Sequence, residues 1–400
     1  MPYSFETVSA VKENPRYEEM IARRRELYAR EHDLRDPFLR DYTRVLHSTA
    51  FRRLKHKTQV FFSPQSDHIC TRIEHTLHVE SIGDTIARSL SLNRELTRAI
   101  AISHDLGHSP FGHKGERVLS AIARQELKED FWHEKNGLFF VEHIELLEDE
   151  NRKKQNLNLT YAVRDGIVSH CGEKDQNHLK PREEAVDLEL YDRPNRFSPF
   201  TYEGCVIKMA DRIAYVGRDL EDAFALGILS PRQREELTEV IAPYTGDKLN
   251  NTNLINFFIT DLVQNSSPEE GIAFSEGGAK LLGLLREYNT KNIYSTRRVI
   301  LADKYFELII REIFDALIAF YDGDQTGARL LEAEGMYESL PRKFYNWLST
   351  YWSLERAPNL NNPPIYNMTR RDDYVRAVLH YISGMSDKYA IDTYHDIISF

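Results

Sequence analysis

The chain has 400 residues, with 52 Lys and Arg, 62 Asp and Glu, a formal net charge of −10, 41% apolar residues and three cysteines. This composition excludes a disordered or low-complexity chain and provides enough apolar side chains for a large core. The acidic balance argues against dense coating by nucleic acid, although a local basic cluster can still hold a small polyanion.

Sequence features also favour a soluble, cytoplasmic protein. The N-terminal residues contain no apolar segment of the signal-peptide kind, and no stretch approaches the roughly 18 uninterrupted apolar residues that a membrane span needs. Cys70, Cys171 and Cys205 are odd in number and lack a C-x-x-C spacing, so neither a disulfide framework nor a thiolate zinc site is indicated. We therefore expect reduced cytoplasm and no membrane partner.

Apolar periodicity predicts helices through most of the chain, and no alternating β ladder of any length is found. From His75 to Leu90 the apolar stripe advances by 4, 3, 4 and 4 residues, which is one face of a helix and places His75 on the buried side. The length allows several domains or one large helical domain. We place a soft boundary near residue 230, between an N-terminal segment with the catalytic core (1–230) and a C-terminal helical region (231–400). The predicted helices cover residues 72–92, 93–105, 138–150, 202–226, 297–321 and 372–383.

Polar residues occupy three positions where a helical core favours apolar side chains. They are His75, the adjacent pair His104 and Asp105, and Asp211, on three different predicted helices. Two neutral imidazoles and two carboxylates would balance a divalent charge and leave coordination positions open for water or phosphate oxygen. A single buried histidine is more often a core residue than a ligand, but the four together predict a catalytic metal site. The set holds no thiolate, so it suits Mn²⁺, Mg²⁺ or Fe²⁺, with Zn²⁺ or Ni²⁺ as alternatives in a crystal.

Five segments make the chain resemble a known family, the HD-domain deoxynucleoside triphosphate triphosphohydrolases, also called dGTPase-like. The H…HD…D pattern alone occurs in many phosphohydrolases, whereas HDLGHSPFGHKGE together with RRLKHKTQVF is narrower. The resemblance implies an all-α, mostly helical HD-domain phosphohydrolase fold with additional C-terminal helices. The segments are VLHSTAFRRLKHKTQVF (45–61), TRIEHTLHV (71–79), HDLGHSPFGHKGE (104–116), MADRIAYVGRDLED (209–222) and GMSDKYA (384–390).

The resemblance assigns the metal to the same four residues and implies a catalytic pair, His113 and Glu116. Pro110 and Gly112 are expected to break the helix after the HD pair, so that His108 and His113 lie on a loop beside the ion. Glu116 could then orient the His113 imidazole, and the resemblance brings His133 to the phosphates. The structural alternative is that these histidines only stabilise a tight loop.

Substrate-binding residues are expected on the Asp211 helix. Lys208, Arg212, Tyr215 and Asp219 recur at spacings of 4, 3 and 4 and form one polar face. The resemblance implies that Tyr215 and Asp219 line the nucleotide pocket, where a ring could stack on sugar or base and a carboxylate could accept the 3′-hydroxyl. The alternative is a solvated helix face.

The resemblance implies that part of the basic run at residues 52–57, together with Arg72, meets the triphosphate, and that Gln59 contacts the deoxyribose. Such a run is otherwise a solvated face or a nucleic-acid patch. Lys388 in GMSDKYA stands where related enzymes have an arginine, which keeps the charge but loses bidentate phosphate geometry.

The expected activity is metal-dependent hydrolysis of a deoxynucleoside triphosphate, dGTP or another dNTP, to deoxynucleoside and inorganic triphosphate. Water activated by the cation would attack the α-phosphorus, and His113, supported by Glu116, would handle the proton of the departing 5′-oxygen. The resemblance further implies a homo-oligomer, hexamer or tetramer, with a nucleotide activator and single-stranded DNA as further candidate ligands. Two alternatives stay open: another HD phosphohydrolase acting on nucleoside monophosphates or an alarmone, and a non-catalytic helical regulator that binds nucleic acid.

Overall fold

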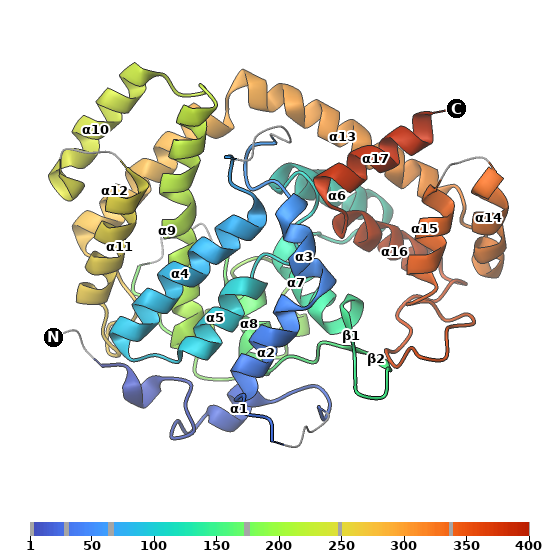
Figure 1. Ribbon diagram of the computed structural model, residues 1–400, viewed down its shortest axis with the longest axis horizontal. Helices are drawn as coiled ribbons and strands as arrows, with labels where there is room; N and C mark the ends of the chain where they lie inside the picture. Colours follow the sequence, from blue (N-terminus) through green and yellow to red (C-terminus); the bar gives the residue numbers. More distant parts are fainter. Residues whose placement is uncertain are drawn as a thin grey trace.

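The computed structural model describes residues 4–27, 32–62, 68–171, 177–246, 250–335 and 339–399. Within these residues the protein is built from 17 α-helices and one short antiparallel sheet, which confirms the all-α prediction (Figure 1). No helix in this part of the chain combines the length and the apolar character that crossing a bilayer requires.

The first part of the chain forms the core that carries the site. Helix α4 packs against α5 and α9, while α5 also contacts α2 and α8, and α7 packs on α8. The elements are α1 (Tyr17–Ile21), α2 (Pro37–Leu46), α3 (Thr49–Arg53), α4 (Arg72–Leu90), α5 (Arg94–Ser103), α6 (His113–Glu126), α7 (His133–Phe139), α8 (Tyr161–Ser169) and α9 (Tyr202–Ala225), with strands β1 (Leu146–Glu148) and β2 (Lys154–Asn156).

The remaining helices flank this core on two sides. Figure 1 shows α10 to α12 on one side of α4 and α9, α14 to α17 on the other, and α13 running between the two groups. Buried apolar side chains from both sides of residue 230 form one continuous core, with α9 against α11 and α12, and α6 against α13 and α16. These elements are α10 (Pro231–Thr245), α11 (Asn251–Asn265), α12 (Glu276–Asn289), α13 (Arg297–Ile318), α14 (Thr326–Glu332), α15 (Leu340–Leu348), α16 (Arg371–Ser383) and α17 (Asp387–Ile398).

Local sequence explains where the central helices begin. Thr71 and Glu74 form a capping box at the start of α4, and the Asn93 side chain accepts a hydrogen bond from the Leu96 amide at the start of α5. His75 and the apolar residues after it are buried along α4, as the spacing predicted. The capped starts therefore set the rotation of both helices and direct their polar residues inward.

The connection between α5 and α6 is tightly folded against α7. Phe111 and Gly112 both have positive φ, 63° and 59°, in a turn that begins α6 at His113. A Cβ on Gly107 would lie 2.0 Å from the carbonyl oxygen of His133, so only glycine permits this close approach. The loop after the HD pair is thereby pressed onto the first turn of α7.

The prediction of one helix over residues 138–150 is wrong. The chain leaves α7 through a π-turn at Phe140–Ile144 and then enters β1, whose Leu146 pairs with Asn156 and Glu148 with Lys154 of β2. The periodicity of this segment reflects the π-turn and a half-buried strand, two short pieces that a single helical pattern cannot separate.

Candidate metal centre and active site

The four predicted metal ligands converge from three helices. His75 lies on α4, His104 follows the last residue of α5 with Asp105 next to it, and Asp211 lies on α9. His75 Nε2 is 2.9 Å from Asp211 Oδ1, and His104 Nε2 is 3.3 Å from Asp105 Oδ1 and 3.9 Å from Asp211 Oδ1. The ligand atoms of His75, His104 and Asp211 all lie within 4.8 Å of one another. This separation is what one shared cation requires.

The chemistry of the cluster fits a divalent cation. His104 Nδ1 lies 2.6 Å from the carbonyl oxygen of Ala101, which fixes the tautomer and directs Nε2 at the carboxylates. That Nε2 is buried and has no hydrogen-bond partner, a costly arrangement that a coordinated ion would relieve. Burial opposes ionisation of Asp211, but its hydrogen bond and charge interaction with His75 lower its pKa to about 2. The carboxylate is therefore ionised and ready to coordinate.

Arg72 holds Asp105 in place. Its guanidinium Nη1 lies 2.8 Å from Asp105 Oδ2, and its Nη2 donates to the carbonyl oxygens of Thr58 and Gln59, at 3.2 Å each. The side chain is fully buried, so this ion pair is shielded from water. The geometry makes Arg72 a positioning residue for Asp105, and its Nε is buried without a hydrogen-bond partner.

His170 is a residue that sequence reasoning missed. It follows the last residue of α8, its Nδ1 lies 2.7 Å from the carbonyl oxygen of Ile167, and its Nε2 lies 4.0 Å from Asp105 Oδ1. Its ring stands 4.9 Å from that of His104. The signal in the sequence was a histidine at the end of an apolar helix, the same context as His104, but without the following aspartate.

The four predicted catalytic residues also come together. His108, His113, Glu116 and His133 place their ligand atoms within 4.8 Å of one another, with His108 and His133 rings 3.8 Å apart. His108 Nδ1 lies 3.1 Å from Asp105 Oδ1. This His/Glu cluster therefore adjoins the metal centre directly.

Two details of this cluster differ from the sequence expectation. His113 is the first residue of α6 and not a loop residue, because the Gly112 turn already starts the helix. Glu116 Oε2 is closer to His133 Nδ1, at 2.9 Å, than to His113 Nδ1, at 3.5 Å. One carboxylate therefore orients two imidazoles, and its nearer partner is the one on α7.

The electrostatic states of the imidazoles differ. Burial disfavours the charged form of His133, but the nearby carboxylates of Glu134 and Glu116 raise its pKa to about 9. Burial and the Arg72 charge hold the pKa of His108 well below its usual value. His113 has a side chain that is 64% exposed. The cluster thus contains a buried cation, a neutral ring and an imidazole open to solvent.

The polar face of α9 is largely buried, so the alternative of a solvated helix face is wrong. Lys208 donates to Asn195 Oδ1 at 2.5 Å, and Arg212 lies against the sulfur of Met209. The half-buried ring of Tyr215 packs against the hydrophobic core. This face therefore continues the interior that contains Asp211.

Asp219 ends that face and has a partner that sequence analysis did not identify. Its carboxylate accepts a hydrogen bond from the Tyr294 hydroxyl, which follows α12 on a π-turn at Thr290–Tyr294. Burial raises the pKa of Asp219 to about 7, and the charges of His75 and His113 act on it in the opposite direction. Asp219 is thus electrically coupled to both halves of the site, and its hydrogen-bond partner is a tyrosine that no local motif marks.

Two residues of the basic run, Lys57 and Arg53, make structural contacts, whereas Arg52 and Lys55 are exposed. Lys57 is buried and donates to the carbonyl oxygens of His108 and Ser383. Arg53 pairs with Glu145 at 2.9 Å. Gln59 lies beside Arg72, and its side-chain Oε1 is buried without a hydrogen-bond partner, so it stays a candidate for substrate contact.

The structure does not bring Lys388 to the metal centre. Its side chain is 77% exposed and lies 3.0 Å from Asp392 one turn later on α17. The preceding residue, Asp387, is buried and accepts hydrogen bonds from the amides of Thr58 and Phe111, at 2.8 Å each. The GMSDKYA segment therefore reaches the active-site loops through its aspartate, because the helix turns the lysine outward.

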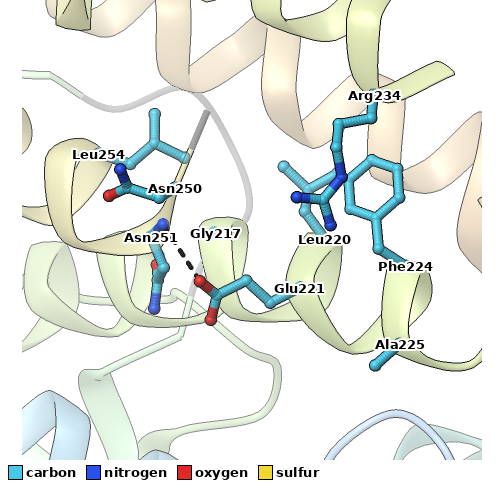
Figure 2. A pocket seen from close by; sticks show the side chains of 9 residues that line it. All are labelled: Gly217, Leu220, Glu221, Phe224, Ala225, Arg234, Asn250, Asn251 and Leu254. Carbon is cyan, nitrogen blue, oxygen red and sulfur yellow. Dashed lines mark hydrogen bonds between the residues drawn. The ribbon is translucent and has the colours of Figure 1, made fainter. Parts of the chain in front are cut away.

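A separate pocket lies on another face of α9. Figure 2 shows Arg234 stacked on Phe224 and the hydrogen bond from the Asn251 amide to Glu221, at 3.3 Å. The cavity is about 260 Å³ and lies between α9, α10 and α11. Its lining residues Gly217, Leu220 and Phe224 lie more than 100° around the helix from Asp211, so this pocket is not part of the metal centre.

Comparisons with known proteins agree with this geometry. The family model described as "HD domain" matches residues 72–216. A "deoxyguanosinetriphosphate triphosphohydrolase-like protein" of Caldanaerobacter subterraneus subsp. tengcongensis is 33% identical over 366 residues, 91% of this chain and 86% of that protein. Proteins of the same description from Desulfatibacillum aliphaticivorans and Clostridium tetani are 36% and 28% identical, over 74% and 98% of this chain and 77% and 94% of their own lengths.

Proposed function

Because the chain belongs to the deoxyguanosinetriphosphate triphosphohydrolase-like family of HD-domain phosphohydrolases, we propose that it hydrolyses a deoxynucleoside triphosphate to deoxynucleoside and inorganic triphosphate. The observation that carries the proposal is the contact between two clusters. Asp105 belongs to the metal centre, yet it lies 3.1 Å from His108 of the His/Glu cluster. Ligands for a cation and groups that move protons therefore share one buried site.

A divalent cation at His75, His104, Asp105 and Asp211 would polarise a phosphoryl oxygen and lower the pKa of a water nucleophile. The donor set of nitrogen and carboxylate oxygen suits Mn²⁺, Mg²⁺ or Fe²⁺. Arg72 keeps Asp105 oriented toward the cation through its buried ion pair. The protein thus contributes a rigid, ionised ligand set.

Around that centre, each of the three imidazoles has a different role in the proposed reaction. His133, held as a cation by Glu116 and Glu134, binds phosphate oxygens and offsets their charge. His113, oriented by the same Glu116 and open to solvent, delivers the proton to the departing 5′-oxygen. His108 is neutral and supports Asp105.

In this proposal the deoxyribose and base are bound between Gln59 and the polar face of α9 that carries Tyr215 and Asp219. The Gln59 side-chain oxygen is buried without a partner, and its backbone carbonyl accepts a hydrogen bond from Arg72; a close amide here would disfavour a 2′-hydroxyl. Tyr215 offers a ring, and Asp219, with its pKa near 7, can accept or donate a hydrogen bond to the 3′-hydroxyl. Which of the four bases is preferred depends on pocket shape rather than on these residues.

The proposal includes a homo-oligomer, a hexamer or a tetramer. Four apolar side chains on α13 face solvent although they lie within three turns of one helix, and such a stripe is typical of a covered surface. They are Ile300, Leu301, Tyr305 and Leu308.

Product analysis tests the function directly. Chelator-treated protein is incubated with each dNTP, alone and mixed, plus Mn²⁺, Mg²⁺ or Fe²⁺, and all products are separated by chromatography. Inorganic triphosphate with deoxynucleoside supports the proposal, whereas orthophosphate or pyrophosphate supports another HD phosphohydrolase acting on a different nucleotide. Activity only in mixtures indicates a nucleotide activator. Binding of single-stranded DNA without any hydrolysis would favour the regulatory alternative.

A further inference from the structure

Next to the metal centre, the thiol of Cys171 lies beside two imidazoles, and none of these three residues is among the four HD ligands. Cys171 Sγ is 3.3 Å from His133 Nε2, and the ligand atoms of Cys171, His133 and His170 all lie within 4.8 Å of one another. With bond lengths of about 2.0–2.3 Å, tetrahedral zinc holds its donors about 3.5 Å apart. The distance between Cys171 Sγ and His133 Nε2 is close to this value.

Both imidazoles present the correct nitrogen. His133 Nδ1 lies 2.9 Å from Glu116, and His170 Nδ1 lies 2.7 Å from the carbonyl oxygen of Ile167. Each second contact leaves Nε2 to face the thiol, which is the usual support of a zinc-bound histidine. The Nε2 atom of His170 is also buried and has no hydrogen-bond partner. An empty acceptor in the interior is expensive unless a ligand occupies it.

The surrounding charge favours a cation. Glu134 is buried, lies 3.4 Å from His133 Nδ1 and interacts with the Cys171 thiol. Two imidazoles, one thiolate and a nearby carboxylate neutralise a divalent ion. Binding displaces the protons of the thiol and of the His133 imidazolium, as is general for zinc sites.

We propose that Cys171, His133 and His170 form a second cation site, selective for Zn²⁺ and similar thiophilic divalent ions and distinct from the HD centre. Cysteine spacing alone could not indicate it, because the site uses one thiol and takes a histidine from 38 residues earlier in the chain. Hard cations such as Mg²⁺ prefer oxygen donors and do not fill it. The following consequence rests on the proposed function: an ion bound at this second site withdraws His133 from the phosphate and so inhibits hydrolysis.

Spectroscopy tests the site without using activity. Chelator-treated, reduced protein is titrated with Co²⁺ or Cd²⁺, and the thiolate-to-metal charge-transfer absorption is recorded. We expect this band in the wild type and in Asp211→Asn, which removes a ligand of the HD centre only. Cys171→Ser should lose the band, while the matched control Cys70→Ser should keep it.

Metal content provides the second measurement. With Zn²⁺, the wild type should bind one more equivalent per chain than Cys171→Ser, and thermal unfolding checks that the variant is folded. A wild type without the band, or a band that persists in Cys171→Ser, overturns the proposal. These results do not depend on substrate, so an inactive protein that still shows the band would refute only the proposed function.

Discussion

Removing the charge of Glu116 tests the electrostatic design of the active site. Glu116 Oε2 lies 2.9 Å from His133 Nδ1, and both side chains are largely buried. Loss of an opposite charge at this distance should lower a pKa by about 1–3 units, which is about 1.4–4 kcal/mol of lost stabilisation of the imidazolium. From its value of about 9, the pKa of His133 in Glu116→Gln should therefore fall toward neutrality. Glu134 remains, so we expect the lower part of that range.

The assay is NMR of labelled histidine side chains in metal-free protein, with the His133 signal assigned by its loss in His133→Gln. For a shift of one unit, the protonated fraction of His133 at pH 8 falls from about nine-tenths to about one-half. The basic limb of the pH–rate profile should move to lower pH accordingly. Glu126→Gln, on the same helix but paired with Arg371, is the matched control. An unchanged His133 pKa in Glu116→Gln would refute the reasoning.

Three further changes follow from the same structure. His113→Ala should keep its bound cation, as measured by metal analysis, but lose turnover by ~10²- to 10⁴-fold in steady-state kinetics. Full activity of this variant would remove His113 from the mechanism. Asp387→Ala leaves two backbone amides without their acceptor, so urea titrations should show a free energy of unfolding that is lower by about 2–4 kcal/mol. An unfolding midpoint equal to that of the exposed control Asp392→Ala would contradict this. Leu301 is 56% exposed on α13, so Leu301→Asp places a charge on the proposed oligomer surface and should reduce the mass measured by light scattering. A wild type that is already monomeric would disprove the oligomer.

Much of the helical core was predictable because its signals are local. The apolar stripe that begins at His75 predicted α4 and its buried face, and the polar positions on three such stripes predicted the metal ligands. The convergence of His75, His104 and Asp211 within 4.8 Å is a property of packing. A buried imidazole or carboxylate is costly, however, and so already implies a partner. The clearest predictions thus came from residues whose burial needs an explanation.

What sequence analysis missed depends on contacts across long separations. Tyr294 reaches Asp219 from 75 residues away, and Asp387 reaches Thr58 from 329 residues away. Neither partner stands in a pattern that marks it. In the GMSDKYA segment the sequence pattern favoured Lys388 as the residue that reaches the site. The rotation of α17 instead turns Lys388 to solvent and brings Asp387, the residue before it, to the active-site loops. Helix phase at a chain end is set by capping and packing, which a single sequence constrains weakly.

The most direct test of the central claim is Mn²⁺ binding followed by electron paramagnetic resonance. Mn²⁺ suits imidazole and carboxylate donors and avoids the thiol of the second site. The account predicts one tightly bound Mn²⁺ per chain in the wild type and in His113→Ala, and none in Asp211→Asn or His75→Ala. Tight Mn²⁺ binding in either Asp211→Asn or His75→Ala would contradict it.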